Sequence, residues 1–247
     1  MGIGKKLAVS MVIAFMSVAF VFSCGKKSGQ GTSLDRQSED SRVFYANIAD
    51  ALVAEAVKLP EAQTSGGPGI FDIMKNRVST LADDFTVGKV SSKELSTLLW
   101  AATGQNRPNS GWTIPLARSS EPYCRVYVTG EEGTFLYDWK TNSLVKTSNE
   151  DARTKVSSRD FLARISHVLI FVTDGKAMET LRVRDGDHVN DWPAIAMGTM
   201  MQQVYLAAEA MGIGTRYISN LNNDVIHSVC GLESVDIPLG IMPIGKR

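Results

Sequence analysis

The sequence has no excess of either charge sign. Lysine and arginine together number 26, aspartate and glutamate together number 26, and the formal net charge is zero. Outside the N-terminal region no run of basic residues is longer than two. Proteins that bind nucleic acid neutralise its phosphates with clustered lysine and arginine. The sequence therefore argues against nucleic acid as a partner.

Cysteine is scarce. Cys24 falls in the N-terminal leader described below, which leaves Cys124 and Cys230 for the rest of the chain. In an oxidising compartment these two thiols could form a disulfide, but nothing in the sequence brings them together. We expect two buried free thiols, with the disulfide as the alternative.

Histidine is equally scarce, and its spacing excludes a simple metal motif. His167, His188 and His227 show no ligand-like spacing to one another or to a cysteine. The sequence also contains no recognisable catalytic triad or carboxylate pair. We therefore expect no metal site, and the sequence by itself marks no catalytic acid or base.

The first 24 residues have the order of a secretory leader. Lys5 and Lys6 precede an apolar run, Leu7–Phe22, that is short for a membrane-spanning helix. The run leads into Val-Phe-Ser-Cys, which resembles a bacterial lipobox. We expect a lipoprotein signal over residues 1–24, a lipid on Cys24, and export to the periplasm or cell surface with the chain held at the membrane. A retained anchor and cleavage elsewhere are the alternatives.

Residues 25–63 are predicted to form a flexible tether with a short helix between the leader and the folded domain. The segment 26–40 is polar and rich in glycine and serine, which suits a flexible tether. Apolar residues within 41–59 have roughly helical spacing, so a short helix is expected there. The breaker 60–69 contains Gly-Gly-Pro-Gly. We therefore assign the folded domain to residues 64–247.

A long helix is predicted between Asp191 and Gly212. Asp191 suits the N-cap, Pro193 falls in the first turn, and Gly212 can adopt the left-handed conformation that ends helices. Apolar residues in between fall on nearly every face, as in a buried helix. The rest of the domain is expected to pack around this helix, with a strand near Tyr217 following it.

Five other segments have clear local patterns. Ser91 and Glu94 have the spacing of a capping box at the start of a helix. Residues 112–128 end in the alternating pattern of a strand, and residues 133–151 read as a hairpin. Two apolar runs, 165–174 and 237–247, suit buried core strands.

One pair of residues suggests an anion site. Arg77 is followed two residues later by Ser79. A guanidinium beside a hydroxyl suits an oxyanion such as phosphate. A surface or ion-paired arginine is the alternative.

Together these segments resemble the nitroreductase family of flavoproteins. Residues 75–85, KNRVSTLADDF, followed by SSKELSTLLWAATGQNRP, are similar to the family's Arg-Arg-Ser-x-Arg-x-Phe motif and its helix ending in Leu-Leu-Trp-Ala-Ala. Residues 198–208, GTMMQQVYLAA, are similar to its Gly-x-x-x-Gln-Asn-x-x-Leu-x-Ala. The resemblance runs from residue 64 to the C-terminus and is closest to the thiazoline-oxidase-like dehydrogenase branch.

The resemblance implies an FMN site. An arginine and a serine would hold the phosphate, a loop after the first long helix would touch the flavin ring and ribityl chain, and a backbone amide after the second would face the flavin N5. A basic C-terminus would add phosphate contacts. The residues implied are Arg77, Ser79, Thr113, Pro115, Ser119, Gln202, Ser219, Asn220, Lys246 and Arg247.

Some positions depart from the family pattern. Val78 and Leu81 stand where the family has cationic residues, and Asn220 stands where a glycine is common. In the loop, Trp112 and Leu116 replace an arginine and a serine, and Ser119 likewise replaces an asparagine. These departures leave open a flavin-less binding or structural lipoprotein of the same fold.

The resemblance also implies the fold and the chemistry. The fold expected is α+β: a mostly antiparallel sheet flanked by helices, with a central buried helix, in an intertwined homodimer with two FMN sites at its interface. The activity expected is ping-pong hydride transfer between NAD(P)H, or another electron donor, and a small organic substrate. A carrier of apolar ligands, with the methionine-rich helix as a pocket wall, is a third possibility.

Overall fold

The computed structural model describes residues 56–107, 111–116 and 122–247. The predicted leader, Cys24, most of the predicted tether and Ser119 lie outside these ranges. Within them, no helix is both long enough and apolar enough to cross a membrane.

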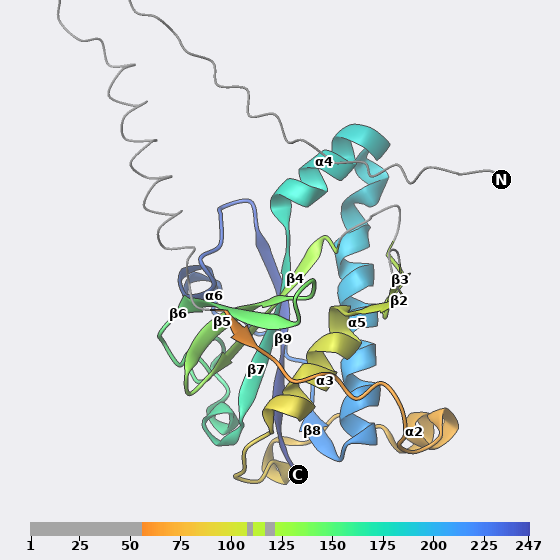
Figure 1. Cartoon of the computed structure of the whole chain (residues 1–247). Coiled ribbons are helices and arrows are strands. Elements are labelled where there is room, and N and C mark those ends of the chain that lie inside the picture. Colours follow the sequence, from red (N-terminus) through yellow and green to blue (C-terminus); the bar gives the residue numbers. More distant parts are fainter. Residues whose placement is uncertain (1–55, 108–110, 117–121) are drawn as a thin grey trace, which may run out of the picture. The chain divides into compact units, whose positions relative to one another are not determined.

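The core of the fold is a seven-stranded sheet in the order β1-β6-β5-β4-β7-β9-β8, in which all neighbours are antiparallel (Figure 1). A separate two-stranded ribbon pairs β2 with β3. The strands are β1 (Val57–Lys58), β2 (Gln105–Arg107), β3 (Gly111–Trp112), β4 (Cys124–Gly130), β5 (Gly133–Asp138), β6 (Ser143–Ser148), β7 (His167–Thr173), β8 (Ile213–Thr215) and β9 (Ile237–Lys246).

Helices pack on both faces of the sheet, as expected for an α+β fold. Two apolar clusters reflect these faces: one contains residues of α3 and α5, and the other contains residues of α6. The helices are α2 (Ile70–Asn76), α3 (Ser92–Thr103), α4 (Gly175–Asp185), α5 (Trp192–Ala210) and α6 (Asn223–Cys230), with 3-10 turns η1 (Ala82–Asp84), η2 (Asp160–Arg164) and η3 (Asp187–Asp191).

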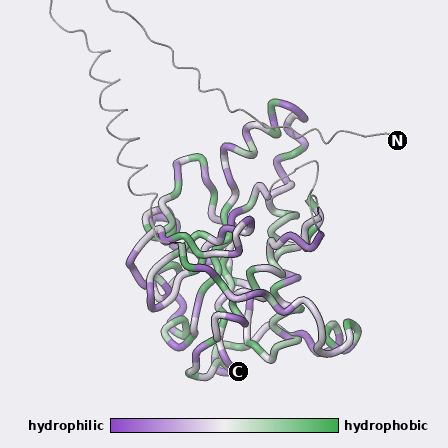
Figure 2. The backbone as a smooth tube through the Cα atoms, in the orientation of Figure 1, coloured by the Kyte–Doolittle hydropathy of each residue, from purple (hydrophilic) through white to green (hydrophobic). Residues whose placement is uncertain are grey.

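The central strands are the apolar runs of the sequence. In β7 six consecutive residues from Val168 onward are buried, because the strand lies between β4 and β9 and is covered on both faces. Figure 2 shows hydrophobic stretches along these strands and polar ones in the connecting loops. The predicted strand at 165–174 and the predicted C-terminal strand are both confirmed.

The hairpin and the first long helix also form where their local signals predict. The β5–β6 turn places Asn142 at φ +48°, a left-handed conformation that asparagine tolerates. At α3, the Glu94 N–H donates to Ser91 Oγ at 3.3 Å and the Ser91 N–H donates to Glu94 Oε2 at 2.7 Å. These two bonds complete the predicted capping box.

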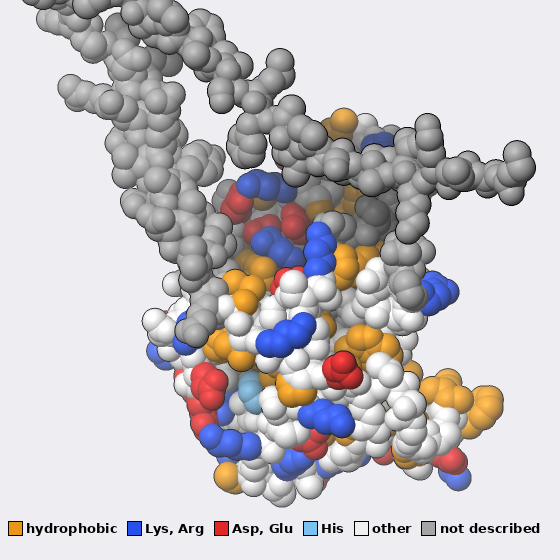
Figure 3. All heavy atoms as spheres, viewed as in Figure 1, with side chains coloured by type: hydrophobic (Ala, Val, Ile, Leu, Met, Phe, Trp, Pro, Cys, Tyr) orange, Lys and Arg blue, Asp and Glu red, His pale blue; other side chains and the backbone are white. Residues whose placement is uncertain are grey.

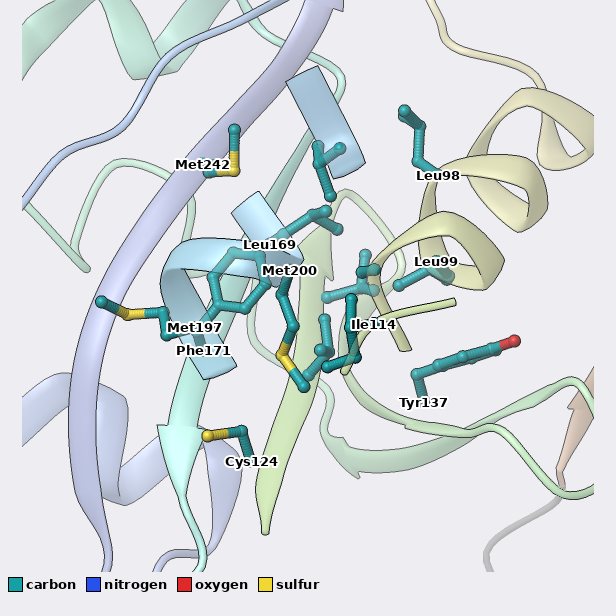
Figure 4. Packing of buried hydrophobic residues seen from close by; sticks show 14 of the residues in the cluster. Leu98, Leu99, Ile114, Cys124, Tyr137, Leu169, Phe171, Met197, Met200 and Met242 are labelled. Atoms are coloured by element: carbon teal, nitrogen blue, oxygen red, sulfur yellow. The ribbon is translucent and has the colours of Figure 1, made fainter. Parts of the chain in front are cut away.

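Helix α5 is buried on one face in the single chain. Figure 4 shows Met197 and Met200 of this helix close to Phe171 and Leu169 of β7. Its buried residues, at helical spacing, are Pro193, Ala196, Met197, Met200, Val204 and Ala208. The other face is open, and Ile195 is 62% exposed. The expectation of burial on all sides is therefore wrong for the described chain, because α5 lies against the sheet and α3 with one face only.

The packed part of the chain begins before residue 64. Val57 and Lys58 form β1 and pair with Leu144 and Ser143 of β6, where a helix was expected. Leu59 is buried, and Ser96 Oγ donates to the Pro60 carbonyl at 2.6 Å. The end of the predicted tether thus adds an edge strand to the sheet.

The two cysteines of the described chain are free and buried, as preferred from the sequence. Burial raises the pKa of the Cys124 thiol to about 12, helped by the charge of Asp174. Burial likewise raises the pKa of the Cys230 thiol to about 12. Neutral, buried thiols are chemically inert, so neither is a candidate nucleophile.

Candidate functional site

The segment after α2 carries the predicted anion-binding pair. Arg77 ends α2, and the chain then runs alongside β8. There the Thr80 N–H donates to the Thr215 carbonyl at 3.0 Å, and the Thr215 N–H donates to Thr80 Oγ1 at 3.1 Å. These two bonds anchor Arg77 and Ser79 at the edge of the main sheet.

Arg77 and Ser79 meet at Tyr205 of α5. The Arg77 guanidinium carbon lies 5.1 Å from the centre of the tyrosine ring, and Ser79 Oγ lies 3.0 Å from the tyrosine hydroxyl. The same hydroxyl accepts a hydrogen bond from the Tyr217 N–H at 2.8 Å. Tyr205 therefore positions the Arg77 guanidinium, the Ser79 hydroxyl and the Tyr217 backbone, which leads to Ser219.

The cluster leaves hydrogen-bond donors available to a ligand. Among the described residues, no carboxylate lies within ion-pairing distance of Arg77. If the Tyr205 O–H donates to Ser79 Oγ, the serine hydrogen is free for an acceptor. A stacked, unpaired guanidinium beside such a hydroxyl suits the oxygens of a phosphate.

The C-terminal cations are engaged by carboxylates. Lys246 Nζ lies 2.7 Å from Glu94 Oε1, and Arg247 lies 2.9 Å from Glu209 Oε2. Burial acts to raise the pKa of Glu94, but hydrogen bonds from Lys246 and Ser91 outweigh it and leave that pKa lowered. Of these three cations, Arg77 is the one available to bind an anion. Lys246 and Arg247 would first have to break their ion pairs with Glu94 and Glu209.

The predicted flavin-ring loop lies on a different side of α5. The Thr113 carbonyl accepts a hydrogen bond from Gln203 Nε2 at 3.1 Å, and Thr113 Oγ1 donates to the Trp100 carbonyl at 3.2 Å. Pro115 is exposed beyond it. Gln203 and Tyr205 are two residues apart, which is about 200° around a helix. The structure therefore does not bring Thr113 and Pro115 to Arg77 and Ser79 within one chain.

The remaining predicted residues are exposed. Gln202 faces solvent, and its neighbour Gln203 makes the loop contact instead. Ser219 is exposed just beyond Tyr217, while the Asn220 amide donates to Ser158 Oγ at 3.0 Å. Ser219 follows Tyr217 by two residues, and the Tyr217 N–H is bonded to the Tyr205 hydroxyl.

One site residue was not predicted from the sequence. Tyr205 contacts Arg77, Ser79 and the Tyr217 backbone. In the sequence it is a single tyrosine one turn after Gln202 in a largely apolar helix, and that pattern alone does not mark it as a site residue.

Comparison with known proteins identifies the family to which the chain belongs. A sequence model of the nitroreductase family matches residues 76–246, which include the Arg77–Ser79 segment and the last strand. The chain belongs to the nitroreductase family. This assignment identifies it as a member of a family of oxidoreductases, in agreement with the resemblance seen in the sequence motifs.

Individual nitroreductases are similar over most of the chain. A candidate nitroreductase of Methanocaldococcus jannaschii is 27% identical over 173 residues, covering 66% of this chain and 85% of its own length. The crystal structure of a candidate nitroreductase of Ralstonia eutropha has a TM-score of 0.69 at 27% identity, covering 77% of this chain and 89% of that one. These relatives agree with the α+β nitroreductase-like fold described above.

A more distant structure bears on the predicted branch. A chain of the Escherichia coli microcin synthetase McbBCD complex has a TM-score of 0.56 at 14% identity, covering 89% of this chain and 99% of that one. Similarity at this level of identity shows the shared fold alone. The thiazoline-oxidase-like branch stays a prediction.

Proposed function

We propose that this nitroreductase-family protein is an FMN-dependent oxidoreductase whose flavin phosphate binds at Arg77 and Ser79. The observation that carries the proposal is the unpaired Arg77 guanidinium stacked on Tyr205, with Ser79 bonded to the same ring's hydroxyl. When bound, the flavin would supply ping-pong hydride transfer between a donor such as NAD(P)H and a small organic substrate.

The residues of the chain have positioning roles in this proposal. Arg77 and Ser79 bind the phosphate by charge-assisted hydrogen bonds. Tyr205 orients both residues and holds the Tyr217 backbone, which sets the path of Ser219. No protein side chain is assigned as a catalytic acid or base.

We propose a homodimer as the functional unit. Helix α2 has no buried residue, and its Phe71 is 83% exposed beside the exposed Ile70 and Met74. A short helix is marginal without tertiary packing. A second copy that covers α2 and the open face of α5 would bury these side chains.

The same dimer explains the divided site. Within one chain, α5 separates the Thr113 loop from the Arg77 cluster. In a two-fold dimer the same surface patch occurs on both copies, so a loop remote from its own site can reach the site of its partner. We propose that Thr113 and Pro115 approach the flavin bound at the partner's Arg77 and Ser79.

Visible absorption of the purified full-length protein tests the function. The enzyme is expected to be yellow, to bleach with dithionite and with NADH or NADPH, and to regain its colour with a nitroaromatic or a quinone. If dithionite bleaches it but neither nicotinamide does, the donor is a different electron carrier. A colourless protein that takes up no added FMN would refute the flavin role.

A flavin-less module of the same fold is the second candidate. It is favoured by the carboxylates that engage Lys246 and Arg247 and by the exposed, uncharged Val78 and Leu81. In that case the protein would remain dimeric and folded without FMN. The absorption experiment separates the two candidates directly.

We also propose that residues 1–24 act as a lipoprotein signal and that Cys24 carries the lipid. The support is the sequence order of the leader. Labelling of expressing cells with a radioactive fatty acid is expected to mark the protein, and Cys24→Ser is expected to abolish the label. A labelled Cys24→Ser protein would contradict this proposal.

A further inference from the structure

A second recess, away from the proposed flavin site, has the shape and lining of a ligand cavity. Its volume is about 420 Å³, and its apolar wall includes Leu95 of α3, Val128 of β4, Phe135 of β5 and Leu144 of β6. None of Arg77, Ser79 and Tyr205 lines it. Figure 3 shows the face that carries β1 and α3, where apolar side chains lie among charged side chains of both signs.

Charged side chains surround the opening. Lys89, Arg153 and Arg164 contribute three positive charges to the lining, whereas Glu131 and Glu132 contribute two negative ones. An apolar recess with a few polar groups at one end is the usual form of a small-molecule site. This lining suits a ligand with an apolar body and one charged end.

The cations differ in how firmly they are held. Arg153 donates to Asp151 at 2.6 Å and to the Ile165 carbonyl at 2.6 Å, so it is part of the wall. Lys89 is paired with Glu131 at 2.7 Å, but its side chain is 81% exposed. Exposed ion pairs of this kind contribute little free energy, so Lys89 can turn to a ligand at small cost.

His167 adds a neutral polar group to the same lining. The Val90 N–H donates to Ser166 Oγ at 3.0 Å, and Ser166 Oγ lies 2.9 Å from His167 Nδ1. Because Ser166 Oγ already accepts the Val90 N–H, we assign the serine hydrogen to a bond toward His167 Nδ1. The imidazole proton is then on Nε2, which can donate to a ligand. Burial, followed by the charge of Arg153, lowers the pKa of His167 to about 4, so the ring is uncharged at neutral pH.

We propose that this cavity binds a medium-chain carboxylate, with its hydrocarbon chain against Leu95, Val128 and Leu144 and its carboxylate at Lys89 and Arg164. Asp151 neutralises Arg153, and Arg164 donates to the Ala82 carbonyl at 2.9 Å with Asp83 3.9 Å away. A carboxylate is favoured over an ammonium group because the polar groups that can turn to a ligand, the Lys89 ammonium, the Arg164 guanidinium and His167 Nε2, are all hydrogen-bond donors. The apolar wall favours an alkyl chain over a short, fully polar acid.

Calorimetric titration of the full-length protein with octanoate tests the proposal, with octanol and octylamine as matched probes. Octanoate is expected to bind at least about tenfold more tightly than either, because a charge-assisted hydrogen bond is worth at least that factor. The Lys89→Gln, Arg164→Gln double variant is expected to remove this preference. Lys93→Gln, an exposed change on α3 outside the lining, is expected to keep it.

A cavity-filling variant gives an independent measurement. Leu144→Phe adds volume to the wall, so it is expected to abolish octanoate binding while the thermal unfolding midpoint stays close to that of the parent protein. No octanoate binding by the parent protein, equal binding of the three probes, or full binding by Leu144→Phe would each overturn the proposal. A large drop in the midpoint would show that the recess has no spare volume and would also overturn it.

Discussion

At the scale of single residues, the candidate site depends on Tyr205. Its ring stacks on Arg77, and its hydroxyl contacts both Ser79 and the Tyr217 backbone. The motif resemblance predicted Arg77 and Ser79 because they are close in sequence. It could not predict Tyr205 as their support, because that role arises only when α5 packs beside the end of α2.

Removal of the Arg77 guanidinium tests the phosphate role. Arg77→Ala is expected to weaken FMN binding by about 1.5–3 kcal/mol, the range for a hydrogen bond to a charged group. Flavin fluorescence during an FMN titration measures this change. Lys75→Ala removes a neighbouring charge from the last turn of α2 and is expected to have a much smaller effect. Equal affinities of the parent protein and Arg77→Ala would refute the assignment.

His167 predicts a pH dependence of folding stability. Its folded-state pKa is lowered to about 4 from an ordinary value of 6.5, mainly by burial. Between these two pKa values the unfolded chain binds more protons than the folded chain, so the free energy of unfolding rises with pH. The stability that the neutral His167 contributes is therefore lost as the pH falls from 6.5 to 4. The loss from pH 7 to pH 4 is expected to be about 3 kcal/mol.

Urea unfolding across this pH range measures the effect. His167→Gln removes the titrating group, so its stability is expected to fall less steeply than that of the parent protein between pH 6.5 and pH 4. The carboxylates of the chain contribute to both curves, and the difference between the two curves isolates the histidine. Parallel curves would show that His167 keeps an ordinary pKa.

At the scale of secondary-structure elements, the capping box of α3 does two things. Ser91 and Glu94 satisfy N–H groups at the start of the helix, and Glu94 also holds Lys246 of β9. Ser91→Ala is expected to lower the free energy of unfolding by about 1 kcal/mol, the usual cost of a lost N-cap. Chemical denaturation measures this loss, with the exposed Ser92→Ala as the matched control. Equal losses would show that the cap contributes nothing specific.

The elements best predicted from sequence have strong local signals. The Ser91–Glu94 box, the turn at Asn142 and the apolar run of β7 each fix their own structure within a few residues. Strand β1 was missed because two residues give no periodicity and form a strand only by pairing with distant β6. The neutralisation of Lys246 by Glu94 was missed for the same reason, since 152 positions separate the two residues.

At the scale of the whole molecule, the proposed dimer accounts for the exposed apolar side chains of α2 and α5. Phe71→Glu places a charge in the proposed interface and is expected to shift the protein toward monomers in sedimentation velocity. Val183→Glu makes the same change at an apolar α4 residue that is 86% exposed, and is expected to leave the dimer intact. A monomeric parent protein would rule out the dimer, and an unchanged Phe71→Glu dimer would place the interface elsewhere.

The central claim is that one FMN site draws on two copies of the chain, and mixed dimers test it most directly. Arg77→Ala removes the phosphate contact, and Pro115→Glu places a negative charge on the loop proposed to face the flavin. Each variant alone is expected to bind little FMN. A purified heterodimer of the two variants is expected to regain one of its two sites, because one Arg77 and the partner's unaltered loop then meet. A heterodimer that binds no more FMN than either variant alone would contradict the claim.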